Sequence, residues 1–383
     1  MNIDSTPNYI FDEKNFLENY NVYRGKYLFS EIAAVLKSNA YGVGNLKRLV
    51  SILKVAGCKI FYVGTLDEAL AVKKTSPKSS VYVLYTKLSS RVLKIFLQED
   101  LIFVIKSAGE ILEIDNFLKS ETNKDFCEFK KIKVAIKIDS GLSRLGLNKN
   151  DLEEVYEIFK KNQSFLKVES IFSHLACSGE NVIDNKVQLE EFNFLSEKYF
   201  PKVKKSISAS NVLLRGESFE FEQDIIRVGS GLYGLVYDTV AKELGLQFPL
   251  KIKARILRFF DVEKGDKVGY GGSFIAKKKM KLATVQVGYS DGLPLRNRGV
   301  YFLYDGLESK KAYKLNVVGV ISMNLTTIDI SSVPFKEFKK NNFVYVISDK
   351  EHFNNIVKAS KSSPLELFCK LGLGINNKVF KKK

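Results

Sequence analysis

Lys37 is the residue of this chain whose position most favours covalent chemistry. It ends the apolar run 32–36, and Asn39, Gly42 and Gly44 interrupt the pattern directly after it. A run rich in small and branched apolar residues is typical of a parallel strand buried on both faces. A lysine at the end of such a strand stands where parallel α/β folds present reactive side chains, and a desolvated amine can form a Schiff base. The ordinary alternative is a solvated surface lysine.

Further polar and glycine residues follow other apolar runs of the chain. Each alone has an ordinary explanation, such as a surface charge, a helix cap or a turn. Small residues and glycines after the last two strands of a parallel barrel are typical of a phosphate site, and phosphate beside a strand-end lysine indicates pyridoxal phosphate. The residues are, in chain order, Tyr41, Lys137, Asp139, Arg144, His174, Ser208, Ser210, Asn211, Arg227, Gly229, Ser230 and Gly231.

Apolar runs alternate with helical spacing through the first part of the chain. Helical spacing covers residues 66–72, 92–97, 111–117, 152–159 and 189–199. The runs that read as strands are 32–36, 60–63, 81–85, 101–105, 132–138, 168–172, 206–208 and 225–228. Eight strands with helices between them predict a closed (β/α)₈ barrel of the TIM type over residues 1–237.

The pattern changes after Gly234. Short strand signals follow one another with Gly, Asp and Asn breaks and little helical spacing, at residues 252–257, 282–287, 317–321, 325–330 and 343–347. This texture predicts a second, mostly β domain over residues 238–383. The α/β fold class is therefore a barrel followed by a mostly β domain.

Charge and apolar content restrict the class of partner. The 383 residues carry a formal net charge of +17 and are 45% hydrophobic. The lysines are scattered, with runs only at 277–279 and 381–383, so we expect a basic surface that attracts small anions and not a nucleic-acid interface. No apolar stretch approaches the length of a membrane span, and no secretion signal is visible. We expect a cytoplasmic protein with no membrane contact.

Cysteine and histidine content argues against a metal site. The only histidines are His174 and His352, and the four cysteines show no metal-ligand spacing. We expect reduced thiols, and a buried structural role for Cys177, three residues after His174. The other cysteines are Cys58, Cys127 and Cys369.

Five segments of the chain, taken together and in order, resemble the alanine racemase family. They are residues 37–44, 137–144, 227–234, 287–292 and 318–323. The resemblance runs from about residue 32 to residue 372. It implies an N-terminal (β/α)₈ barrel, a C-terminal β domain and pyridoxal 5'-phosphate as cofactor. It also implies a head-to-tail homodimer in which the β domain of one subunit completes the barrel mouth of the other.

The resemblance assigns the two bases that inversion of a carbon centre requires. Lys37 corresponds to the lysine that holds the cofactor and serves as one base, and Tyr270 of the partner subunit corresponds to the opposing base. A single base would return the proton to the face from which it came, so a second acid on the other face is needed. His174 would link the tyrosine to Arg227, which lies at the pyridine nitrogen in the family.

Other family roles fall on polar residues of the same motifs. Arg144 and the backbone of Met323 would hold the substrate carboxylate, and Tyr289 would line the entrance. Lys137 matches a position that is carbamylated in some members. The phosphate contacts implied are Tyr41, Ser210, Asn211, Gly229 and Ser230.

Several positions depart from the family pattern. Val43 replaces a histidine, Asn324 stands where aspartate is common, and Leu365 falls where a phosphate-contacting tyrosine is usual. The order Ser210-Asn211 is inverted, and residues 374–377 lack the customary arginines. Neither base is lost, but these departures leave the phosphate contacts and the substrate preference open.

The leading functional hypothesis is an alanine racemase that supplies D-alanine for cell-wall peptidoglycan. A racemase of the same fold acting on serine, lysine or several amino acids is the nearest alternative. A non-catalytic pyridoxal phosphate carrier is a third, and Tyr270 argues against it because a carrier has no use for an opposing base. A decarboxylase fits less well, because those enzymes place a carboxylate against the pyridine nitrogen.

Overall fold

The chain contains two compact units. The structure is a computed structural model that describes residues 7–120, 123, 130–176, 182–211, 221–295, 299–306, 309–339 and 341–382. Residues 17–40 and 45–247 form one unit, which we call the barrel unit. The described residues up to Phe16, residues 41–44 and the chain from Phe248 onward form the other, which we call the sheet unit.

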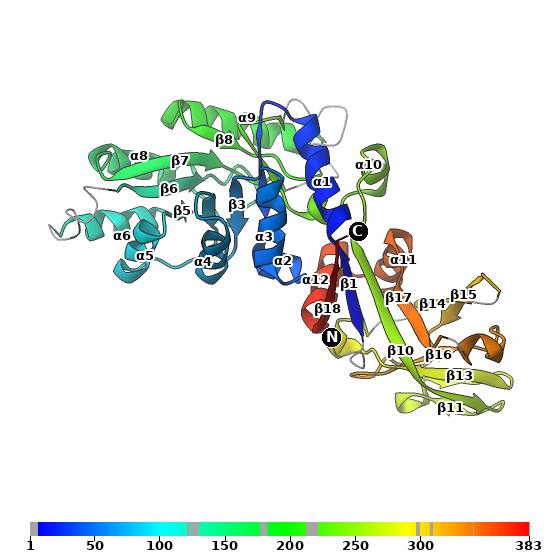
Figure 1. Cartoon of the computed structure of the whole chain (residues 1–383). Helices are drawn as coiled ribbons and strands as arrows, with labels where there is room; N and C mark the ends of the chain where they lie inside the picture. The colour runs from blue at the N-terminus through cyan, green and yellow to red at the C-terminus, as the bar shows by residue number, and fades with distance from the viewer. Residues whose placement is uncertain are drawn as a thin grey trace. The chain divides into compact units, whose positions relative to one another are not determined.

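The barrel unit is built on eight parallel strands, as the alternating pattern predicts (Figure 1). Neighbours pair in the order β8-β7-β6-β5-β4-β3-β2-β9, and a parallel bridge between Ala209 and Arg227 joins the ends of this series. The strands are β2 (Glu31–Val35), β3 (Ile60–Val63), β4 (Ser80–Val83), β5 (Ile102–Ile105), β6 (Ile132–Lys137), β7 (Leu166–Phe172), β8 (Lys204–Ser206) and β9 (Ile225–Val228). The predicted (β/α)₈ architecture is confirmed, although β8 begins and ends two residues earlier than expected.

Helices follow the strands where cap residues stop the extended chain. Thr65 caps α4 with its side chain and Asn148 does the same for α8. Such caps satisfy backbone N–H groups that the first helical turn leaves without partners. The right-handed helices described between Glu13 and Glu243 are α1 (Glu13–Lys26), α3 (Leu46–Val55), α4 (Leu66–Thr75), α5 (Ser90–Gln98), α6 (Ala108–Leu118), α8 (Lys149–Lys161), α9 (Val182–Tyr199) and α10 (Asp238–Glu243).

Side chains from alternate strand positions form one core cluster of the barrel unit. Tyr62 and Tyr82 stack with their ring centroids 4.3 Å apart, and the ring of Phe172 meets Tyr62 edge-on. Ala33 and Ile102 belong to the same cluster, and all five residues are buried. The carboxyl ends of the strands are therefore held on a packed interior.

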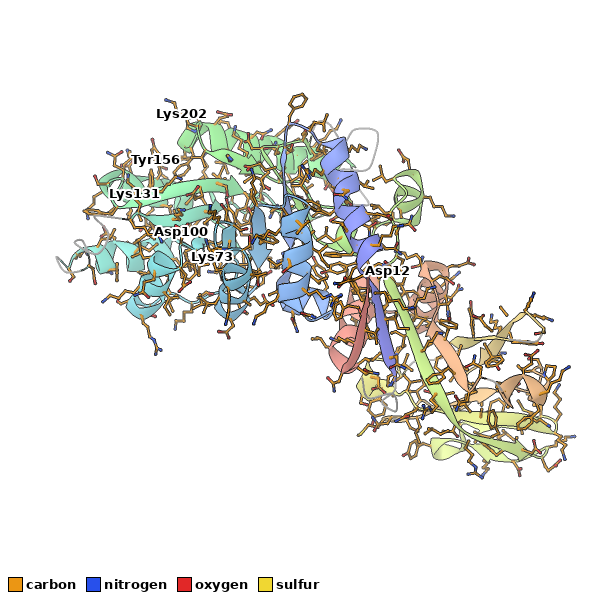
Figure 2. All side chains as sticks on the ribbon, viewed as in Figure 1. Asp12, Lys73, Asp100, Lys131, Tyr156 and Lys202 are labelled. Carbon is orange, nitrogen blue, oxygen red and sulfur yellow. The ribbon has the colours of Figure 1, made fainter. Side chains whose placement is uncertain are left out.

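An ion cluster lies at the amino-terminal ends of the strands. Asp100 precedes β5, and its carboxylate forms ion pairs with Lys73 Nζ at 3.7 Å and with Lys133 Nζ at 2.9 Å. Figure 2 labels Lys73 and Asp100 on the barrel unit. Because this cluster lies before the strands, it serves stability and not the chemistry expected at their carboxyl ends.

The sheet unit contains an eight-stranded sheet in the order β15-β14-β17-β10-β1-β18, with β13 pairing with β10 and β16. The long strand β10 pairs with the N-terminal strand β1, which in turn pairs in parallel with β18. A two-stranded sheet of β11 and β12 is separate from it. The strands are β1 (Asn8–Asp12), β10 (Leu250–Val262), β11 (Lys267–Val268), β12 (Phe274–Ile275), β13 (Met280–Val285), β14 (Tyr301–Asp305), β15 (Ala312–Asn316), β16 (Thr326–Asp329), β17 (Phe343–Ile347) and β18 (Asn377–Lys381).

The strand predicted at residues 317–321 is wrong. Strand β15 ends at Asn316, and Val317 makes only an isolated bridge to Ile328. Gly319 has φ +72, a conformation that breaks the extended chain. The unit also carries two helices, α11 (Lys350–Ser360) and α12 (Pro364–Gly374), beside its strands.

The cysteines and the possibility of a membrane span can be assessed only for the described residues. Cys58 and Cys369 are reduced thiols, whereas Cys127 and Cys177 lie outside the described residues. Among the helices that are described, none combines the length and apolar content of a membrane span.

Candidate active site

Lys37 opens a left-handed turn at the carboxyl end of β2. This turn is α2 (Lys37–Tyr41), in which Ser38, Asn39 and Ala40 have φ between 51 and 57 and ψ between 49 and 54. Tyr41 follows with φ 59. Left-handed helical geometry costs about 1–2 kcal/mol for each non-glycine residue. Surrounding contacts must therefore hold this turn in place, and backbone strain of this kind clusters at functional sites.

Three hydrogen bonds hold the turn within the barrel unit. The Ala40 N–H donates to the Leu36 carbonyl at 2.9 Å, and the Tyr233 hydroxyl donates to the Ala40 carbonyl at 3.1 Å. The Asn39 N–H donates to Glu68 Oε1 at 2.7 Å. Each bond fixes one peptide group of the turn that follows Lys37.

The chain after the turn packs within the sheet unit, where a glycine is required. Gly42 has φ +82, and a Cβ on it would lie 2.6 Å from the backbone oxygen of Cys369. Lys378 Nζ donates to the Gly42 carbonyl at 2.7 Å. A side chain at position 42 is excluded both by the backbone conformation and by this close approach.

The Lys37 amine faces a tyrosine that sequence reasoning missed. Lys37 Nζ lies 3.5 Å from the Tyr85 hydroxyl, at the outer limit of a hydrogen bond, and 6.0 Å from the centre of the ring. Tyr85 follows β4 and is 48% exposed. The signal that could have found it is its position just beyond a barrel strand, which is the kind of position used to select the other candidates.

Four cationic side chains act on His174 at this end of the barrel. This histidine follows β7 and is half-buried. Burial, followed by the charges of Arg227, Arg144, Lys37 and Lys137, lowers the pKa of His174 to about 3. The imidazole is therefore neutral at physiological pH, and the five predicted site residues lie close enough to influence one another.

Lys137 is a buried lysine at the end of β6. Burial, together with the cationic side chains of Arg144 and Arg227, lowers the pKa of its amine to about 8, and Asp139 acts in the opposite direction. Asp139 uses one carboxylate oxygen to accept from the N–H groups of Gly141 at 3.1 Å and Ser143 at 3.0 Å. The same aspartate thus shapes the loop that leads to Arg144.

Arg227 is buried with neutral hydrogen-bond acceptors around it. Its Nε donates to Ser206 Oγ at 3.0 Å, and its Nη2 donates to the carbonyls of Ser173 and Ile207. The guanidinium also lies 4.8 Å from the centre of the Phe172 ring. Burial lowers the pKa of Arg227, but a guanidinium stays protonated in proteins. A buried cation with neutral partners favours a ligand that offers an acceptor or a negative charge.

Ser210 organises the glycine-rich segment after β9. Its hydroxyl oxygen accepts from the N–H groups of Gly229 at 3.1 Å and Gly231 at 3.2 Å. A Cβ on Gly231 would lie 2.2 Å from the Tyr23 hydroxyl, so the backbone approaches α1 closely there. Asn211 Oδ1 is buried and has no hydrogen-bond partner among the described residues. The Ser210 hydroxyl and the side-chain N–H groups of Asn211 are donors, which a phosphate group requires.

Three further predicted residues belong to the sheet unit. Tyr270 begins the short 3₁₀ turn η4 (Tyr270–Gly272) and is 74% exposed. Tyr289 begins η5 (Tyr289–Asp291), and its N–H donates to the Ser322 carbonyl at 3.0 Å, beside the exposed Met323. These residues are available on the surface of the unit, and their action on Lys37 stays a prediction.

Two family models match nearly the whole chain. The N-terminal domain of alanine racemase matches residues 11–236, and the C-terminal domain of alanine racemase matches residues 250–379. Among curated proteins, the alanine racemase of Brucella abortus is 29% identical over 371 residues, covering 92% of this chain and 88% of its own. The alanine racemase of Borreliella burgdorferi is 28% identical over 376 residues, covering 96% of this chain and 95% of its own.

Solved structures agree with this match. The alanine racemase of Bartonella henselae, whose structure has covalently bound pyridoxal phosphate, has a TM-score of 0.82 and 26% identity, with 98% of this chain and 100% of that chain covered. The enzyme of Streptomyces coelicolor has a TM-score of 0.85 at 19% identity, covering 98% of each chain, which shows the shared fold. The barrel, the sheet unit and both family models lead to one conclusion: this chain belongs to the alanine racemase family.

Proposed function

We propose that this chain interconverts L-alanine and D-alanine with pyridoxal 5'-phosphate held at Lys37. The observation that carries the proposal is the gathering of Lys37, Arg227 and a phosphate-compatible glycine segment at the carboxyl ends of the barrel strands. The family match supports the substrate. The cofactor, when bound, withdraws electrons from the α-carbon of an amino acid and makes its proton acidic.

The residues present fit this cofactor. Lys37 supplies an amine at a strand end, and Ser210, Asn211, Gly229, Ser230 and Tyr41 would hold the phosphate. Arg227 would donate a hydrogen bond to the pyridine nitrogen. Because its guanidinium does not give up a proton, it would leave that nitrogen unprotonated and so limit side reactions such as transamination.

Inversion needs a proton donor on each face of the α-carbon. Lys37 serves one face, and Tyr270 of the partner subunit serves the other in a homodimer. The 74% exposure of Tyr270 in the isolated chain supports this arrangement, because a second copy can then use it. His174, kept neutral by its surroundings, can donate its one ring N–H to the tyrosine oxygen and so favour the tyrosine anion.

Arg144 and the backbone of Met323 would bind the substrate carboxylate, with Tyr289 at the entrance. The lowered pKa of Lys137 leaves part of its amine uncharged near pH 8. A neutral amine is the form that combines with carbon dioxide, and we propose that Lys137 forms a carbamate that orients Arg144. The D-alanine would serve peptidoglycan synthesis in the cytoplasm.

The experiment compares amino acids on the cofactor-loaded chain. L-alanine, L-serine and L-lysine are incubated separately, and optical rotation is followed to equilibrium. The rate of loss of rotation should be greatest for L-alanine. A greater rate with serine or lysine would assign a neighbouring racemase activity, and no loss with any of them would favour a carrier.

The variant Tyr270→Phe separates a racemase from a carrier. Removal of a general acid–base group lowers turnover by about 10²–10⁴-fold. Tyr345→Phe, in β17 of the same unit, is the matched control and should leave turnover unchanged. Equal turnover in both variants would remove Tyr270 from the mechanism.

A further inference from the structure

Glu68 is the third residue of α4 and closes the capping box at the start of that helix. Its Oε2 accepts from the N–H groups of Gly64 at 2.7 Å and Thr65 at 3.2 Å, while the Thr65 hydroxyl accepts from the Glu68 N–H at 3.3 Å. This reciprocal pattern alone is a common way to begin a helix.

The second carboxylate oxygen of Glu68 accepts a hydrogen bond that the helix cap does not require. Glu68 Oε1 accepts from the Asn39 N–H at 2.7 Å, 29 residues away in the chain and inside the left-handed turn. A Cβ on Gly64 would lie 3.6 Å from Lys37 Cβ and 3.2 Å from Glu68 Oε2. One carboxylate thus ties the end of β3 and the start of α4 to the strained turn beside Lys37.

We propose that Glu68 is a positioning residue for Lys37. By accepting the Asn39 N–H it holds the left-handed turn, and the turn fixes the direction in which Lys37 presents its amine. The proposal rests on the proposed function, in which Lys37 carries the cofactor. A charged acceptor suits this role, because hydrogen bonds to ionised groups are stronger than those between neutral groups.

Glu110 provides a matched comparison in the same barrel. It is also the third residue of its helix, α6, after the cap position Ser107. Its Oε2 accepts from the Lys106 N–H at 2.8 Å, and its Oε1 pairs with the Lys106 ammonium. Both glutamates bind backbone N–H groups just before a helix, but only the Glu68 carboxylate bonds to the turn of Lys37.

The experiment uses Glu68→Gln and Glu110→Gln in the full chain. Glutamine keeps the size of the side chain but has one acceptor oxygen, so it cannot serve Asn39 and the cap together. The first readout is hydrogen exchange of the peptide containing Asn39 in the cofactor-free chain. The second is the rate at which added pyridoxal phosphate becomes covalently attached to Lys37, measured by borohydride reduction and peptide mass. Thermal unfolding of both variants measures the loss of the cap.

We expect Glu68→Gln to slow attachment at Lys37 by about tenfold and to speed exchange at Asn39 similarly, as loss of a hydrogen bond to a charged group does. Glu110→Gln should lower the unfolding temperature comparably and leave both readouts at the wild-type level. If Glu68→Gln does not fold, Glu68→Asp is used instead, since its shorter side chain cannot span both sets of donors, and the same slowing is expected.

Wild-type attachment and exchange rates in the Glu68 variant would overturn the positioning role, and so would equal slowing in the Glu110 variant. A wild-type chain that takes up no pyridoxal phosphate at Lys37 would instead overturn the proposed function, and the positioning role with it. Attachment of pyridoxal phosphate to Lys37 in the wild-type chain therefore distinguishes failure of the positioning role from failure of the proposed function.

Discussion

Acidification of the cofactor-free chain should destabilise it through His174. The chain contains only two histidines, so few side chains change charge between pH 7 and pH 5. Burial and the surrounding cations Arg227, Arg144, Lys37 and Lys137 lower the pKa of His174 to about 3 in the folded state. The unfolded chain should show the ordinary histidine pKa of about 6.5.

The sign and size of the effect follow from this difference. Below about pH 6.5 the unfolded chain binds a proton at position 174, whereas the folded chain binds it only near pH 3. Stability is therefore lost as the pH falls through this window. At pH 5, which lies about 1.5 pH units below the unfolded-state pKa, the free energy of unfolding should have fallen by about 2 kcal/mol.

The assay is urea unfolding of the cofactor-free chain at pH 7 and pH 5, for wild type and His174→Gln. Burial also lowers the pKa of His352, so its contribution has the same sign and is present in both proteins. The variant should lose about 2 kcal/mol less than wild type on acidification. Equal losses in the two proteins would refute the charge arrangement around His174.

Two further predictions concern the proposed phosphate segment and Lys137. Gly231→Ala would place a Cβ 2.2 Å from the Tyr23 hydroxyl, so we expect a loss of about 1–3 kcal/mol in thermal unfolding, and an unchanged melting temperature would contradict this packing. With ¹³C-bicarbonate, the cofactor-loaded chain should show a carbamate signal that grows from pH 7 to pH 9, because the pKa of Lys137 is about 8. The signal should vanish in Lys137→Met, and its persistence there would place the carbamate elsewhere.

The barrel could be predicted because its strands and helices produce local sequence patterns, namely short apolar runs and helical spacing. Strands β3 and β9 begin and end where the apolar runs do. The sheet unit could be predicted only in part, because its pairing is non-local. Strand β1 lies between β10 and β18, far away in the chain, and nothing in residues 8–12 alone indicates these partners. The false strand at 317–321 shows how a single glycine at positive φ overrides an apolar run.

Some residues of the candidate site could likewise be predicted from local sequence patterns, and others could not. Lys37 and His174 could be selected because each follows a predicted strand, and Arg227 because it lies near the end of one. Glu68 could not, because its local pattern indicates only a helix cap, and its bond to Asn39 depends on the left-handed turn. That turn was unforeseen, since left-handed geometry is unfavourable for serine, alanine and tyrosine.

Incubation of the cofactor-loaded chain with L-alanine in deuterium oxide tests the central claim most directly. Two bases on opposite faces predict that L-alanine is converted to an equal mixture of enantiomers and that the D-alanine formed carries deuterium at its α-carbon. Lys37→Ala should form none. Deuterated L-alanine without D-alanine would show one base acting alone, and absence of both deuterium and D-alanine with cofactor still bound would contradict the racemase account.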